Sequence, residues 1–132
     1  MSTPKGYTRT QIVLHWAVFL LVAAQFILHD GISKAWEAVG EGLPAAFSPL
    51  VALHVATGIL ILALVVWRMA IKIRRGAPAL PENEPAWMKL AADGAHLALY
   101  GLLILMAFSG GMAWFGGVEA AASGHNVLKV LL

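Results

Sequence analysis

A continuous apolar segment, LVALHVATGILILALVVWRMAIK at residues 50–72, restricts this chain more than any other part of its sequence. Residues 49–67 are 19 consecutive residues without Asp, Glu, Lys or Arg. A helix needs about 20 apolar residues to cross the hydrocarbon core of a bilayer. The segment therefore predicts a membrane-spanning helix. The composition agrees, because 12% of the 132 residues are charged, against about 25% in soluble domains.

Two further segments have the same apolar character, so we expect three spans. They lie at about residues 10–29, 49–72 and 91–116. Between the first two spans we expect a loop at residues 29–49, which is rich in glycine and proline. Between the last two we expect a linker at residues 76–88, because its prolines interrupt a helix.

A fourth helix is expected to start near the end of the sequence, at about residue 122, with Ser123 as its N-cap. The segment SGHNVLKVLL is too short to cross a bilayer. The predicted fold is thus an all-α integral membrane domain over residues 1–132, a four-helix transmembrane bundle with its fourth helix only begun in this chain. We expect the natural protein to continue past Leu132.

Basic residues predict the orientation of these spans. Two of them, Lys5 and Arg9, precede the first span, and a cluster of four follows the second, whereas the loop between the two spans contains Lys34 alone. Lys and Arg concentrate on the cytoplasmic side of membrane proteins. We therefore expect a cytoplasmic N-terminus. The net charge of +2 sits beside apolar spans and does not indicate a nucleic-acid partner.

Four histidines each lie within about two turns of an expected helix start, and they fall at two depths. His15 and His96 fall at the inner level, and His54 and His125 at the outer level. A single histidine near a helix end is as readily explained by an interfacial position as by haem ligation. We expect His29 to be such an interfacial residue. Two pairs at two depths favour haem ligation. Histidine is the usual axial ligand of haem b, and two helices must each supply one.

One face of the second span suits a flat anionic ring such as haem b. Steps of three and four residues from His54 place Gly58, Arg68 and Lys72 on that face. Gly58 would let a ring approach the backbone, and the two cations would pair with haem propionates. Ordinary helix packing at Gly58 and membrane anchoring by the cations are the alternatives. The chain has no cysteine, which excludes covalent c-type haem and thiolate-bound iron–sulfur clusters.

Four segments resemble the bacterial cytochrome b561 family, a branch of the group that includes the haem b subunits of nickel–iron hydrogenases. They are YTRTQIVLHW (7–16), LHVATGILILALVVWRM (53–69), AHLALYGLLILMAFSGG (95–111) and GHNVLKVLL (124–132), and they cover essentially the whole chain. The resemblance implies a multi-pass protein of the bacterial inner membrane that binds two haem b groups, one in each leaflet.

The resemblance also implies the ligands of the haem iron. His54 and His125 match the pair that binds the outer haem, and His15 matches one ligand of the inner haem. The second inner ligand of the family lies further along the fourth helix, so the inner site lacks one axial ligand in this chain. His96 matches a histidine beside the inner haem or a quinone, although the residues alone would pair it with His15.

Three functions agree with these patterns. The one that we favour is an electron carrier between the outer face and the quinone pool. Members of the resembling family are linked to superoxide oxidation outside and ubiquinone reduction, which would make the protein an oxidoreductase. The alternatives are a haem b subunit of a larger dehydrogenase or hydrogenase, and an accessory subunit of a membrane complex. The expected partners are lipid and quinone, with a homodimer and a larger membrane complex both left open.

Overall fold

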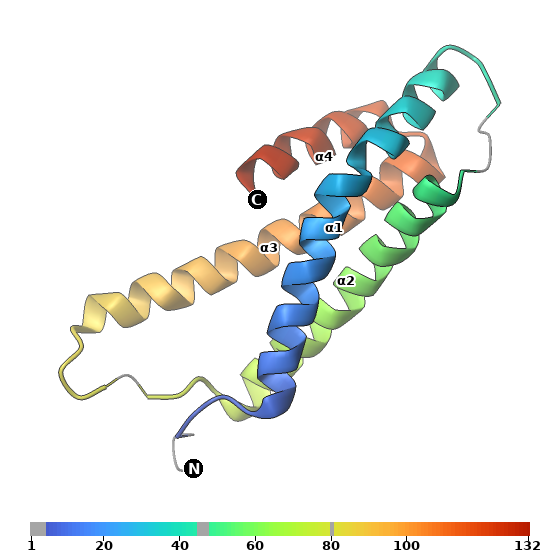
Figure 1. Ribbon diagram of the computed structural model, residues 1–132. Coiled ribbons are helices and arrows are strands. Elements are labelled where there is room, and N and C mark those ends of the chain that lie inside the picture. The colour runs from blue at the N-terminus through green and yellow to red at the C-terminus, as the bar shows by residue number, and fades with distance from the viewer. Residues whose placement is uncertain (1–4, 45–47, 80) are drawn as a thin grey trace.

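The computed structural model describes residues 5–44, 48–79 and 81–132, and these residues form four helices without strands (Figure 1). The helices are α1 (Arg9–Gly40), α2 (Pro49–Arg75), α3 (Ala86–Gly116) and α4 (Glu119–Leu131). The first three are long and apolar enough to cross a membrane. The fourth has 13 residues. The predicted all-α membrane fold with a short fourth helix is therefore confirmed.

The helices pack as two antiparallel pairs. α1 lies against α2, α4 folds back on α3, and α2 joins the two pairs by packing on α3 (Figure 1). The core at the centre is formed by Val18, Ile61 and Val65, with Tyr100 and Leu103 packed against it. The beginning of α3 diverges from α2, whereas its second half lies beside α4. The two pairs thus meet at mid-length.

Helix α1 is longer than the sequence predicted. Residues 30–40 were expected in a loop, but α1 continues to Gly40, so that part of the prediction is wrong. This segment contains good helix formers and no proline. Gly31 also lets α1 approach α2 closely, since an added Cβ would lie 3.1 Å from the Leu50 Cβ. Residues 45–47 of the predicted loop lie outside the described residues.

The boundaries of α3 and α4 also differ from those predicted from the sequence. α3 begins at Ala86 directly after Pro85, so residues 86–88 belong to the helix and not to the predicted linker. Gly117 has a left-handed backbone (φ +64°) and ends α3, and α4 starts two residues later. Ser123 therefore lies inside α4, and the prediction that it is the N-cap is wrong. Val118 occupies that position.

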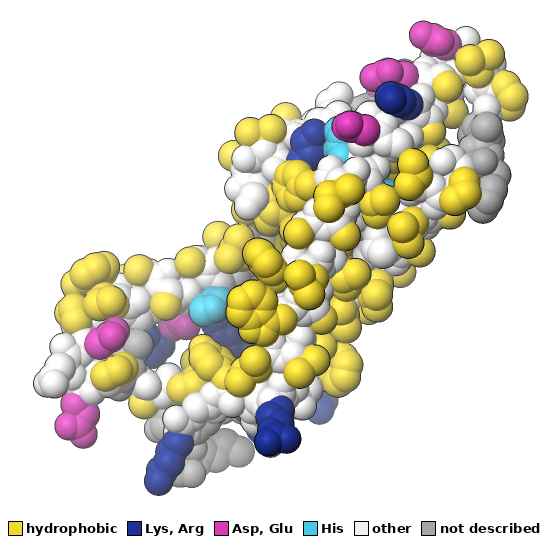
Figure 2. Space-filling view, in the orientation of Figure 1, with side chains coloured by type: hydrophobic (Ala, Val, Ile, Leu, Met, Phe, Trp, Pro, Cys, Tyr) yellow, Lys and Arg dark blue, Asp and Glu magenta, His cyan; other side chains and the backbone are white. Residues whose placement is uncertain are grey.

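The surface divides into an apolar middle and two polar ends. Figure 2 shows hydrophobic side chains along the middle of the bundle, with Lys and Arg gathered at the end that holds the N-terminus. The last turn of α2 supplies Lys72, Arg74 and Arg75 to that end. Large side chains such as Phe19 and Ile27 point outward. Outward apolar side chains on long helices are suited to a lipid bilayer.

Candidate cofactor-binding sites

The α2 face predicted from the sequence turns toward the interior of the bundle. His54 and Gly58 line one cavity, which we call the His54 cavity. Arg68 and Lys72 line a second, the His15 cavity, nearer the N-terminus. Val65 lies between them on the same face and is 0% exposed. One helix face therefore contributes side chains to both cavities.

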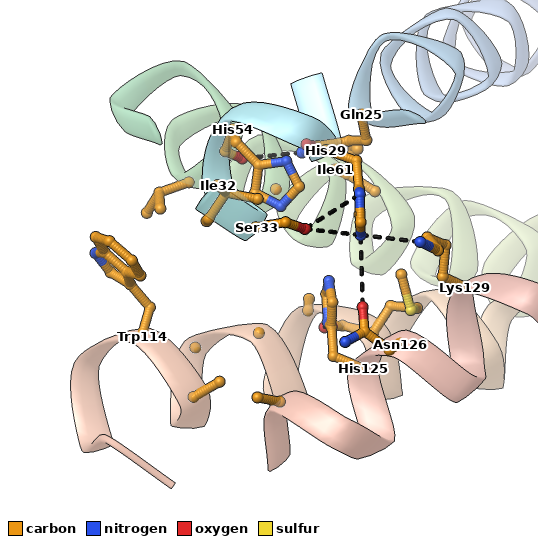
Figure 3. A pocket seen from close by; sticks show the side chains of 18 of the residues that line it. Gln25, His29, Ile32, Ser33, His54, Ile61, Trp114, His125, Asn126 and Lys129 are labelled. Atoms are coloured by element: carbon orange, nitrogen blue, oxygen red, sulfur yellow. Dashed lines mark hydrogen bonds between the residues drawn. The ribbon is translucent and has the colours of Figure 1, made fainter. Parts of the chain in front are cut away.

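The His54 cavity has a volume of about 260 Å³ and is lined by all four helices. His54 from α2 and His125 from α4 point toward each other across it (Figure 3). Their ring centroids are 6.4 Å apart and the ring planes differ by 68°. A metal–imidazole bond of about 2.0 Å, with each centroid about 1.2 Å behind its nitrogen, gives about 6.4 Å between two axial rings. The centroid separation of the pair thus equals that expected for two imidazoles bound to one metal ion.

The ring of His125 is held in one orientation by α3. Its Nδ1 lies 2.9 Å from the backbone oxygen of Met106 and 3.1 Å from Oγ of Ser109. Donation of Nδ1–H to the Met106 carbonyl leaves Nε2 unprotonated, as a metal ligand requires. The ring also lies directly on Gly110, where an added Cβ would be 2.9 Å from Cε1. Gly110 is therefore part of the site.

The surroundings of His54 differ from those of His125. Its Nδ1 is buried and has no hydrogen-bond partner among the described residues. Its backbone oxygen accepts a hydrogen bond of 2.9 Å from Nε2 of Gln25 on α1. Two imidazoles from different helices, in a largely apolar cavity of a chain without cysteine, are the donor set that haem b uses. The residues present fit that group.

His29 was expected at the membrane interface, and the structure places it on the wall of the His54 cavity. Its Nε2 lies 2.9 Å from Nζ of Lys129 and 3.4 Å from Oδ1 of Asn126, both on α4. Ser33 Oγ lies 3.3 Å from its Nδ1. His29 therefore connects α1 to α4 beside the two facing imidazoles. Gln25, His29 and Ser33 are spaced four residues apart, so these polar residues share one face of α1.

The His15 cavity has a volume of about 220 Å³ and brings together His15, His96, Arg68, Lys72 and Tyr100. Arg68 donates from Nη2 to Nδ1 of His15 at 3.1 Å, and its guanidinium carbon lies 5.7 Å from the Tyr100 ring centre. His96 stacks on Tyr100 with centroids 6.3 Å apart. Lys72 lies 3.6 Å from Asp93 of α3. The two histidines predicted at one level therefore share one cavity.

Several residues outside the predicted set also line these cavities. Trp114 lies on the wall of the His54 cavity, together with Gln25 and Asn126 (Figure 3). Tyr7 and Gln11 line the His15 cavity. Gln11 also completes a capping box with Thr8 at the start of α1. A glutamine in the middle of an apolar span, such as Gln25, is the sequence signal that would have identified one of them.

Comparison with known proteins agrees with this geometry. The family model described as prokaryotic cytochrome b561 matches residues 6–132. Cytochrome b562 of Cereibacter sphaeroides is 36% identical over 129 residues, which cover 97% of this chain and 78% of that protein. Cytochrome b561 homolog 1 of Escherichia coli K12 is 30% identical over 136 residues, which cover 96% of this chain and 74% of that protein. No solved structure gives a match. The chain therefore belongs to the prokaryotic cytochrome b561 family, a family of membrane haem b proteins that transfer electrons.

Proposed function

We propose that this protein carries single electrons across the bacterial inner membrane, between a donor at the outer face, such as superoxide, and ubiquinone. The observation that carries the proposal is the pair of imidazoles of His54 and His125, which face each other with centroids 6.4 Å apart. Bis-histidine ligation leaves no open position on iron, which favours electron transfer over binding of a substrate to the metal.

In this proposal His54 and His125 hold the haem of the His54 cavity, and the haem supplies one-electron chemistry when bound. The chain contributes binding, orientation and exclusion of water. The Met106 carbonyl and the bare backbone at Gly110 fix the ring of His125. The largely apolar walls from four helices would limit the access of water to a bound haem, and solvent exposure affects the reduction potential.

The His15 cavity is the second site in this proposal, where we place the second haem or the quinone. His15 would be an iron ligand there, and His96 would lie beside the haem or the quinone. Arg68 and Lys72 bring positive charge to the same cavity, and cations form charge-assisted hydrogen bonds with carboxylates. Arg68 now donates to His15, so it would exchange that bond for one to a propionate. The basic end of the bundle supports a cytoplasmic location for this cavity.

The experiment is a reduced-minus-oxidised spectrum of the full-length protein purified in detergent, together with haem content per polypeptide. We expect a b-type α-band in the wild type. His54→Ala should lose the haem of the His54 cavity, and His15→Ala should lose the other while keeping the first. Full haem content in His54→Ala would refute the ligand assignment. A wild type without an α-band would refute the function. Reoxidation of the reduced protein by a soluble ubiquinone analogue tests the acceptor.

A further inference from the structure

Two buried polar atoms in the His54 cavity lack a hydrogen-bond partner among the described residues. They are Nδ1 of His54 and Oε1 of Gln25. Nearly all buried polar groups in native proteins are paired. When His54 binds a metal through Nε2, its Nδ1 carries the proton and is a donor, whereas an amide oxygen is always an acceptor. The two unpaired atoms are therefore complementary.

The orientation of the Gln25 amide is fixed by its neighbours. Nε2 donates one hydrogen to the backbone oxygen of His54 and the other to Oγ1 of Thr57, both at 2.9 Å. Thr57 donates its own hydroxyl hydrogen to the backbone oxygen of Leu53 at 2.6 Å, so it can only accept from Gln25. Exchanging the amide oxygen and nitrogen would put two acceptors against each other at the His54 carbonyl. Oε1 is therefore the free atom of the amide.

The same contacts place the Gln25 amide against the backbone of His54. Gln25 on α1 is hydrogen-bonded to the backbone of His54 on α2, and both residues line the His54 cavity (Figure 3). Gly58 makes room for this arrangement, since a Cβ there would lie 3.3 Å from Nε2 of Gln25. The space predicted at Gly58 is thus filled by the amide that holds His54.

We propose that Gln25 is a positioning residue of the haem site, with its Oε1 accepting the Nδ1–H of His54 while His54 Nε2 binds iron. The inference rests on the proposed function. His125 already has the equivalent bond, from its Nδ1 to the Met106 carbonyl. Such a bond fixes the ring and its tautomer and makes the imidazole a stronger electron donor. Stronger donation stabilises ferric over ferrous iron, so Gln25 lowers the reduction potential of this haem.

The test is a potentiometric titration of the full-length protein with variants at two neighbouring positions. Gln25→Leu removes the acceptor and should raise the midpoint potential of the His54 haem by about 59 mV, a tenfold shift toward ferrous iron. Thr57→Val is the matched control, because it removes another hydrogen bond of the same amide and leaves Oε1 in place. Thr57→Val should shift the midpoint potential by less than the amount that corresponds to a threefold change in the ferric/ferrous equilibrium. Gln25→Glu keeps an acceptor and should leave the potential at or below that of the wild type.

The outcomes separate this inference from the proposed function. Equal potentials in Gln25→Leu and the wild type, with haem content retained, would overturn the role of Gln25 alone. An equal shift in Gln25→Leu and Thr57→Val would do the same, because it would show a merely structural effect on the α1–α2 contact. If Gln25→Leu does not fold, Gln25→Glu decides, and a raised potential in that variant contradicts the inference. Only a wild type without haem would remove the proposed function as well.

Discussion

Replacing Gly110 by alanine tests the geometry of the proposed haem site with one methyl group. The added Cβ would lie 2.9 Å from Cε1 and 3.1 Å from Nδ1 of His125. Ordinary contacts between carbon atoms are about 3.5–4.0 Å, so the ring must retreat by about 0.6–1.1 Å. The carbonyl of Met106, 2.9 Å from Nδ1, holds the ring on the same side. Relief by a small rotation would therefore break that hydrogen bond.

This displacement is large compared with what a metal site tolerates. Ligand distances in metal sites vary by about 0.2 Å, and loss of one orienting hydrogen bond alone weakens such sites by about 10–100-fold. We expect Gly110→Ala to lower the affinity for haem at least to that extent, equivalent to about 1.4–2.7 kcal/mol. In the protein without haem, overpacking should destabilise the α3–α4 contact by about 1–3 kcal/mol.

Gly101→Ala is the matched control for Gly110→Ala. Gly101 lies on the same helix, and an added Cβ there would meet no atom of the other described residues within 4 Å beyond the helix's own nearby backbone. Alanine is favoured over glycine inside a helix by about 0.5–1 kcal/mol, so this control should be neutral or slightly stabilising. The assay is haem content and the reduced α-band of both variants, purified identically. Gly110→Ala with wild-type haem content and an unchanged spectrum would refute the assignment of His125 as a ligand.

Three further predictions concern stability and orientation. Lys129→Met removes the hydrogen bond to His29 and should lower the free energy of unfolding in detergent by about 0.5–1.5 kcal/mol. The control Lys34→Met should have little effect. Equal losses of stability in the two variants would contradict the contribution of the Lys129–His29 contact. Gly76 has φ +74°, so Gly76→Ala should lower the free energy of unfolding by about 1–3 kcal/mol. If denaturant unfolding finds the variant as stable as the wild type, the backbone at this turn adapts to alanine without cost. The chain has no cysteine, so a single introduced cysteine can be labelled selectively. In spheroplasts, Gly42→Cys in the α1–α2 loop should react with an impermeant maleimide if that loop is outside, and Gly6→Cys should not. The reverse labelling pattern would show the opposite orientation.

The sequence predicted the interior face of α2 because two constraints coincide there. A helix repeats every 3.6 residues, and an imidazole or guanidinium on an apolar span must avoid lipid. His54 and Arg68 therefore had to share the face on which Val65 is buried, and the structure places all three toward the interior. Periodicity and the cost of exposing polar groups to lipid were sufficient for this result.

The neighbours of each histidine could not be predicted in the same way. The contacts of His29 with Lys129 and Asn126 join residues about 100 positions apart, and they depend on how far α1 extends. The glycines and prolines after residue 39 favoured a loop over the whole of residues 29–49, but local helix propensity carried α1 through to Gly40. If α1 ended at residue 29, as the sequence predicted, His29 would lie at the end of the helix. The sequence alone therefore does not indicate that His29 contacts α4.

If His54 and His125 bind one haem as proposed, that haem would also connect the two helix pairs. His54 belongs to the α1–α2 pair and His125 to the α3–α4 pair, and α1 reaches α4 through the hydrogen bonds of His29. Two bonds to one iron would join the pairs at the His54 cavity, which all four helices line. A ligand that binds only the folded state stabilises it by an amount that rises with the logarithm of its affinity. Removal of haem should therefore loosen the contact between the pairs before it unfolds either one. Protection from hydrogen exchange should then fall first in α4, the shortest helix, and persist longest where α1 and α2 pack along most of their length.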